Sequence, residues 1–410
     1  MSSIHLLWDD AHIWGLLLHR ALSHWGVEHQ FVRATEIAQG ALARKPRSLV
    51  LAPGGLASAK SRRLGKAGRA ALREHVRGGG AYLGFCGGAG LALSAPGSAR
   101  ICPWERRGFS SRLHHFTSGH VVARLEPESP LIPPHNSQDI LLPVWWAARF
   151  QEQADGVRPL ARYVRPANDF WVADLPLSQL SAETLDEWER LYGVRIAPNF
   201  HSAPCVVAGE LGKGRYVLSY SHLETPASPQ ANAWLAHLLG ELAEAAPETA
   251  GPVPAWDLSA MDVLWDDDAL VQARRGLEDI LAMGQSHFLL FWRNPWLLGW
   301  RRGIPGSSLN SLYAMVRQAQ AHEPTGRARD YWGRFSRDFR ERFEIFRKGV
   351  CSYLLAERLS MTLATDDPWA VFPKSLKEQK NALFGPPPSS GGLYAELMGM
   401  LEELTWRQFS

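Results

Sequence analysis

The chain has 410 residues, 46% of them hydrophobic and 21% charged, which is ordinary for a globular protein, argues against disorder and leaves room for two or three domains. A formal net charge of +3 is too small to indicate a nucleic-acid partner. The four cysteines show neither CxxC pairing nor metal-ligand spacing, so they predict no zinc site and no disulfide framework. They are Cys86, Cys102, Cys205 and Cys351.

The N-terminal stretch MSSIHLLWDDAHIW lacks a basic start followed by a long apolar core, so it is not typical of a signal peptide. No apolar run approaches the roughly 18 to 20 residues that a membrane span needs. Unpaired cysteines fit a reducing compartment. We therefore expect a cytoplasmic protein without a membrane span.

Strand-like and helix-like segments alternate over residues 4–94. Apolar runs predict strands over 4–8, 29–33, 48–52 and 81–85. Helical spacing predicts a helix that Asp10 caps and Gly26 ends, and a second helix over 64–79. Alternation at these lengths predicts an α/β domain, with a mostly parallel sheet and helices on both faces.

The pattern loosens over residues 95–200, where strand candidates lie at 120–124, 139–146 and 160–164. A hairpin with its turn at Gly212 and Gly214 follows, and then a helix over about 228–245. The Pro-containing stretch 247–257 has the composition of a linker. Residues 258–410 are mostly helical in pattern. We expect a first domain over 1–246 and a helical domain over 258–410.

Cys86 ends the apolar run 81–85 and is surrounded by Gly84, Gly87 and Gly88. A nucleophile on a sharp strand-to-helix turn needs such small neighbours, because the turn strains the backbone and larger side chains would collide with the sheet. A helix starting at Gly87 would favour the thiolate. The alternative is a buried cysteine packed as a small hydrophobic residue.

The segment LVLAPGGL ends another strand in Pro53, Gly54 and Gly55. The carboxyl ends of neighbouring parallel strands meet in one crevice. Glycine amides exposed there can stabilise an oxyanion, with the amide of Gly87 as a second donor. The alternative is a simple turn.

His222 and Glu224 follow a late strand in the segment RYVLSYSHLET. The histidine could take a thiol proton and later protonate a leaving amine, while the carboxylate fixes its tautomer. Among 15 histidines, an acid two residues on could also occur by chance.

These three segments, in this order, resemble the class I glutamine amidotransferase superfamily, with its flavodoxin-like fold. The stretch GGGAYLGFCGGAG most resembles the family named for the N-terminal domain of biotin-protein ligases, over about residues 1–245. The resemblance implies Cys86 as nucleophile, His222 as base, Glu224 as orienting acid, and Gly55 and Gly87 as oxyanion donors. It implies a small-molecule or peptide carboxamide as substrate, a thioester intermediate and no cofactor.

The sequence departs from these families in three places. Leu223 replaces the proline of the usual His-Pro-Glu, the stretch between cysteine and histidine is longer than in the glutamine-hydrolysing members, and no biotin-ligase module follows residue 250. A ligand-binding or scaffold protein that keeps the fold without catalysis is therefore the alternative function.

Further candidates stand near the predicted crevice. Asp9 and Asp10 follow the first strand and could contact a ligand, or they could serve as a helix N-cap. Trp145 and Trp146 are adjacent in a strand, so at most one enters a pocket. The group His114, His115 and His120 lacks a carboxylate or cysteine partner in the sequence, so we expect no metal site.

In the C-terminal region, helical spacing places five aromatic residues on one stripe beneath a solvated basic face. We expect this stripe to pack the domain against the first one, or to bind a protein partner. The segment 287–303 contains Pro295 and is expected to pack into the helical bundle. The stripe consists of Trp332, Phe335, Phe339, Phe343 and Phe346.

Overall fold

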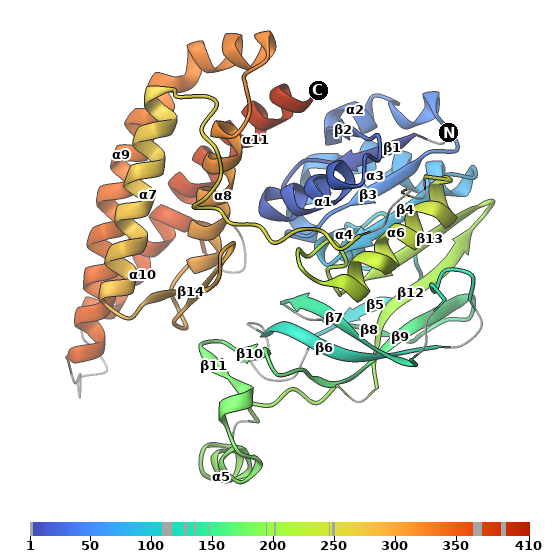
Figure 1. The fold of residues 1–410 in the computed structure, drawn as a ribbon, viewed down its shortest axis with the longest axis horizontal. Coiled ribbons are helices and arrows are strands. Elements are labelled where there is room, and N and C mark those ends of the chain that lie inside the picture. The colour runs from blue at the N-terminus through green and yellow to red at the C-terminus, as the bar shows by residue number, and fades with distance from the viewer. Residues whose placement is uncertain are drawn as a thin grey trace. The chain divides into compact units, whose positions relative to one another are not determined.

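The structure is a computed structural model that describes residues 3–108, 117–126, 129–134, 137–146, 148–193, 195–200, 202–245, 247, 251–363, 371–386 and 391–410. The chain forms two compact units, Met1–Ala255 and Trp256–Ser410 (Figure 1). Within the described ranges no helix is long and apolar enough to cross a membrane.

Five parallel strands form the centre of the first unit in the order β2-β1-β3-β4-β13. Leu51 of β3 pairs with Leu83 of β4, which pairs with Val217 of β13. Every residue of β1, β3 and β4 is buried, as expected when helices cover both faces of a parallel sheet. The strands are β1 (Ile4–Leu7), β2 (Gln30–Val32), β3 (Leu49–Ala52), β4 (Ala81–Phe85) and β13 (Gly214–Ser219).

The 95–200 region extends this sheet with antiparallel strands, so the mostly parallel sheet predicted from sequence is confirmed as a mixed sheet with a parallel centre. Strands β12 (Pro204–Leu211) and β13 form the predicted hairpin. Beyond β12 lie β9 (Val157–Pro166), β6 (Thr117–Leu125), β10 (Trp171–Val172) and β11 (Leu175–Pro176), while β7 (Asp139–Trp145) pairs with β6. A separate ribbon joins β5 (Glu105–Arg107) and β8 (Arg149–Gln151).

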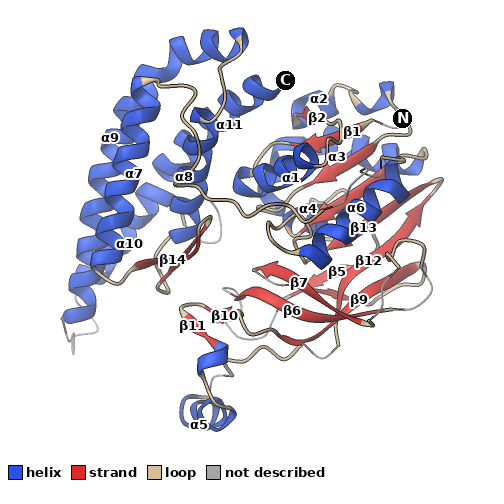
Figure 2. Cartoon of the chain, viewed as in Figure 1, coloured by secondary structure: helices blue, strands red, loops and turns tan. Residues whose placement is uncertain are grey.

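Helices cover both faces of the parallel strands (Figure 2). The crossovers from β1 to β2 and from β3 to β4 run in opposite directions along the sheet, so right-handed connections place α1 and α3 on opposite faces. The helices are α1 (His12–His24), α2 (Ala34–Ala38), α3 (Ala57–Arg77), α4 (Gly87–Ala92), α5 (Ala182–Tyr192) and α6 (Pro229–Ala243), with short 3-10 turns η1 (Leu42–Arg44) and η3 (Leu177–Gln179).

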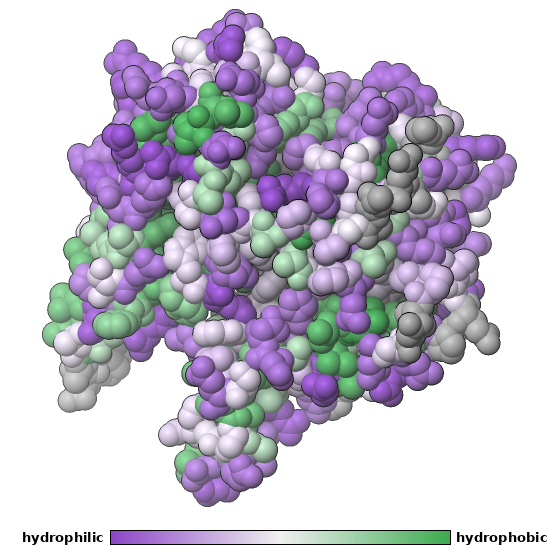
Figure 3. All heavy atoms as spheres, viewed as in Figure 1, coloured by the Kyte–Doolittle hydropathy of each residue, from purple (hydrophilic) through white to green (hydrophobic). Residues whose placement is uncertain are grey.

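The predicted cap of α1 is wrong. Ala11 is the N-cap residue, and within the described residues no side chain caps this helix. The Asp10 carboxylate lies instead 3.5 Å from Arg63 Nε. On the face of the molecule shown in Figure 3 hydrophilic residues predominate, with hydrophobic ones in smaller areas between them.

The second unit is mainly helical, as predicted, but its described residues also include a β-hairpin. The segment expected to join the helical bundle forms β14 and β15, because Asn294 Oδ1 accepts hydrogen bonds from the amides of Trp296 and Leu297 and closes a tight turn around Pro295. The elements are α7 (Asp268–Ser286), β14 (Leu290–Asn294), β15 (Leu297–Trp300), α8 (Gly306–Gln320), α9 (Gly326–Thr362), α10 (Val371–Phe384) and α11 (Gly392–Phe409).

The aromatic stripe on α9 is covered within the second unit. Four of its five side chains are buried, and only Phe335 is substantially exposed, at 41%. Trp332 Nε1 donates to Asp267 Oδ1 at 2.8 Å, and the rings of Phe346 and Phe384 lie 5.4 Å apart. The expectation that the stripe needs the first domain to cover it is therefore wrong, because the unit's own helices bury it.

Candidate active site

Cys86 occupies the turn between β4 and α4 with φ 47° and ψ −104°, a conformation that residues with a Cβ rarely adopt. Its amide donates to Ser219 O at the end of β13, at 2.7 Å. The side chain is partly exposed. The neighbouring strands thus hold the cysteine in a strained geometry, which costs about 1–3 kcal/mol.

The glycines around Cys86 allow backbone segments to approach one another. A Cβ on Gly88 would lie 1.9 Å from Ala52 O, and a Cβ on Gly87 would lie 1.9 Å from Gly55 O. The Tyr82 hydroxyl also donates to Gly88 O at 2.7 Å. The chain therefore lacks side chains around its cysteine because the end of β3 packs directly on the start of α4.

The Pro-Gly-Gly turn after β3 lies beside the start of α4. Gly55 has φ 107°, and a Cβ there would lie 2.3 Å from Asp10 O. A Cβ on Gly54 would lie 2.7 Å from Cε1 of His222. The turn thus brings the backbone of Gly55 beside Gly87 and the backbone of Gly54 against the imidazole ring.

His222 and Glu224 form a buried pair, with 2.7 Å between His222 Nδ1 and Glu224 Oε1 and both side chains fully buried. Trp14 of α1 covers the imidazole, with ring centroids 4.5 Å apart. Because an ionised carboxylate only accepts, His222 Nδ1 carries the proton of this hydrogen bond. Nε2 has no hydrogen-bond partner of standard geometry among the described residues.

The Cys86 side chain neighbours this imidazole closely enough to act on its ionisation. Burial by itself lowers the pKa of His222, but the Glu224 carboxylate and the Cys86 thiol raise it, to about 10 from 6.5. The three segments predicted from sequence to share a crevice are therefore brought together. The arrangement combines a partly exposed thiol, an imidazole and a carboxylate that is hydrogen-bonded to the imidazole.

Supporting residues hold the histidine loop in place, and of these the sequence pointed only to Trp145. Asn232 Nδ2 of α6 donates to Leu223 O and Thr225 O, each at 2.9 Å. The His222 amide donates to Pro143 O of β7, and Trp145 Nε1 donates to Thr225 Oγ1 at 3.1 Å. No motif marks these contacts, and the two from β7 join segments about 80 residues apart.

Asp9 and Asp10 lie near the turn, but their carboxylates are engaged elsewhere. Asp9 accepts from the amide of Ala34 at 2.6 Å and from Arg33 Nε at 3.0 Å, so it fastens the start of α2. The backbone carbonyls of both aspartates accept from the buried Lys60 Nζ. Both carboxylates also form ion pairs with arginines, Asp9 with Arg33 and Asp10 with Arg63.

His114 and His115 fall outside the described residues, whereas His120 is paired with Asp169, an acid that sequence spacing did not reveal. Within the described part of the chain, no group of three or more His, Cys, Asp and Glu side chains is placed to hold a metal ion.

No family model matches the chain, and no curated protein matches it. Similar solved structures include a glutamine amidotransferase, with 18% identity over 59% of this chain and 100% of that one and a TM-score of 0.37. PurLQS from Thermotoga maritima is 13% identical over 59% of this chain and 99% of its own, with a TM-score of 0.35. A β-galactosidase from Bacillus circulans sp. alkalophilus shows 10% identity over 60% and 32%, with a TM-score of 0.34. These names differ in activity, so any function rests on the site itself.

Proposed function

We propose that the chain is a cysteine-dependent amide hydrolase of the amidotransferase type, acting on a carboxamide. The observation that carries this proposal is the buried His222–Glu224 pair beside a partly exposed cysteine on a strained turn. This combination of nucleophile, base and orienting acid is the one that acyl transfer through a thioester requires.

In the proposed reaction, the raised pKa of His222 keeps the proton shared with Cys86 on His222 Nε2, and the Cys86 sulfur bonds to the carboxamide carbon. The tetrahedral oxyanion rests on the amides of Gly55 and Gly87. The C–N bond then breaks, and the departing nitrogen takes the proton from Nε2, which releases ammonia or an amine. Water then gives a proton to His222 Nε2 and attacks the thioester carbon. The carboxylic acid leaves, and the proton on Nε2 is again shared with the Cys86 sulfur.

Burial separates the roles of the cysteines. It raises the pKa of the Cys102, Cys205 and Cys351 thiols, which leaves them poorer nucleophiles near neutral pH. Cys86, by contrast, has the imidazole of His222 as a neighbour. We assign nucleophilic reactivity to Cys86 on this ground.

The resemblance of GGGAYLGFCGGAG supports a finer assignment, to the family of the N-terminal domain of biotin-protein ligases. The alternative is a ligand-binding or scaffold protein that keeps this fold, and its strained turn, without catalysis.

The test compares thiol labelling and amide hydrolysis. Iodoacetamide followed by peptide mapping should modify Cys86 fastest, and a panel of primary carboxamides should include one from which the wild type releases ammonia. Cys86→Ser should abolish that release, whereas Cys351→Ser, which alters the other partly exposed cysteine, should not. Equal labelling of Cys86 and Cys351 would refute a catalytic cysteine.

A further inference from the structure

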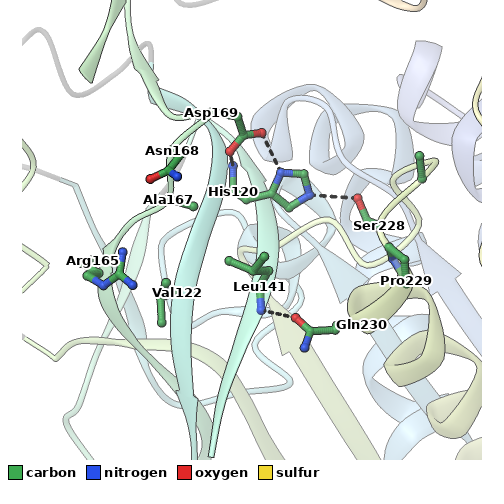
Figure 4. A pocket seen from close by; sticks show the side chains of 11 residues that line it. His120, Val122, Leu141, Arg165, Ala167, Asn168, Asp169, Ser228, Pro229 and Gln230 are labelled. Atoms are coloured by element: carbon green, nitrogen blue, oxygen red, sulfur yellow. Dashed lines mark hydrogen bonds and ion pairs between the residues drawn. The ribbon is translucent and has the colours of Figure 1, made fainter. Parts of the chain in front are cut away.

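A pocket of about 620 Å³ lies in the first unit between the strands of the 95–200 region and the start of α6 (Figure 4). Its volume is within the usual range of small-molecule sites, about 300–1,000 Å³. Cys86, His222 and Glu224 do not line it. The lining includes apolar side chains, among them Val122, Leu141 and Ala167, and a group of polar residues beside them.

Three of these polar residues form a hydrogen-bonded row. Figure 4 shows the His120 ring between Asp169 and Ser228. His120 Nδ1 lies 2.7 Å from Asp169 Oδ2, and His120 Nε2 lies 3.0 Å from Ser228 Oγ. The other oxygen of the carboxylate accepts the His120 amide at 3.0 Å, which holds the acid in place. The row joins β6, the loop after β9 and the N-cap of α6, three segments far apart in sequence.

The carboxylate determines the tautomer of the histidine. Asp169 can only accept, so in the neutral imidazole Nδ1 carries the proton and Nε2 is the acceptor. The Ser228 hydroxyl then donates to Nε2. Its other acceptor, Pro226 O, is more distant at 3.4 Å. This is the arrangement in which a histidine can withdraw a proton from a serine.

Ser228 does not perform the usual task of a serine at its position. It is the N-cap residue of the 15-residue helix α6, yet its side chain makes no cap hydrogen bond within the described residues. Pro229 and Gln230, the first residues of the helix, line the pocket beside it. The positive end of the helix dipole is therefore next to the hydroxyl, where it would favour developing negative charge.

We propose that this pocket is a second acyl-transfer site, with Ser228 as nucleophile, His120 as general base and Asp169 as the acid that orients the base. The apolar lining suits a short aliphatic acyl group, so the substrate class is esters of short-chain carboxylic acids. The site is separate from Cys86 and does not depend on the function proposed above.

In the reaction, the Ser228 hydroxyl proton moves to His120 Nε2 as Oγ bonds to the ester carbonyl carbon. The bond to the alcohol oxygen breaks, and that oxygen takes the proton from Nε2. Water then gives a proton to Nε2 and attacks the acyl-serine, the carboxylic acid leaves, and Oγ recovers the proton. The first-turn amides of α6 would stabilise both tetrahedral intermediates.

The experiment uses the full chain carrying Cys86→Ala, so that the result is independent of the first site. A fluorophosphonate probe should label Ser228, as located by peptide mapping, and p-nitrophenyl butyrate should be hydrolysed. His120→Gln should lower both rates at least about 100-fold, the contribution of a general base. Ser137→Ala, which alters an exposed serine outside the pocket, should change neither rate.

Peptide mapping on the Cys86→Ala chain, called the parent here, requires no substitution in the pocket. Labelling of Ser228 no faster than that of Ser137 would overturn the proposal. Equal rates in the parent and in a folded His120→Gln variant, checked by thermal melting, would also overturn it.

Discussion

Gly54→Ala tests whether the site depends on close packing of the β3 turn against the imidazole. The added Cβ would lie 2.7 Å from His222 Cε1 and 2.8 Å from Trp14 Cγ, whereas ordinary contact begins at 3.4 Å. Both rings, or the turn itself, must therefore move by about 0.6–0.7 Å. A displacement of about 1 Å at a catalytic group costs about 100-fold in rate. Overpacking of this kind also costs about 1–3 kcal/mol of stability.

The assay is the second-order rate of Cys86 alkylation by iodoacetamide at pH 7, measured with the melting temperature of each variant. We expect a fall of about 10- to 100-fold, because the base is displaced while the thiol remains. Gly333→Ala is the matched control, since the same change there meets open space. A Gly54→Ala protein with unchanged alkylation and stability would refute the packing argument and the assignment of His222 as base.

Three further predictions concern the same site. The pKa of His222 is raised to about 10, so the protonated imidazole stabilises the folded protein fully below the unfolded pKa of 6.5. This stabilisation is lost as the pH rises towards 10. Urea unfolding at a series of pH values should show the decline in the free energy of unfolding, and Glu224→Gln should flatten it. Gly87→Ala should lower the free energy of unfolding by about 3 kcal/mol, because its Cβ would lie 1.9 Å from Gly55 O; a loss under about 1 kcal/mol in urea would contradict the close approach. Asn232→Ala leaves two buried carbonyls of the histidine loop unpaired and should cost about 1–3 kcal/mol by thermal melting, with slower Cys86 alkylation; normal values for both would show that the loop holds itself.

Much of the α/β core followed from the sequence, because strand and helix periodicities are local. The apolar run ending at Phe85, the glycines after it and the hairpin turn at Gly212 each depend on a few neighbouring residues. The hairpin around Pro295 was mistaken for part of a helical bundle, since an apolar run of this length fits a strand or a buried helix equally well. The hydrogen bond from the Trp296 amide to Asn294 Oδ1 closes the turn that makes this segment a hairpin.

For the sites, the sequence by itself determined Cys86, His222 and Glu224 as candidates, because each follows a strand whose carboxyl end meets the others in a parallel sheet. Only the tertiary structure decided which groups surround them. Trp14 on the imidazole, and Asp169 and Ser228 on either side of His120, come from segments that no local pattern connects. Contacts of this kind depend on how the inserted strands pack beside the parallel core, and spacing along the chain carries no record of that packing.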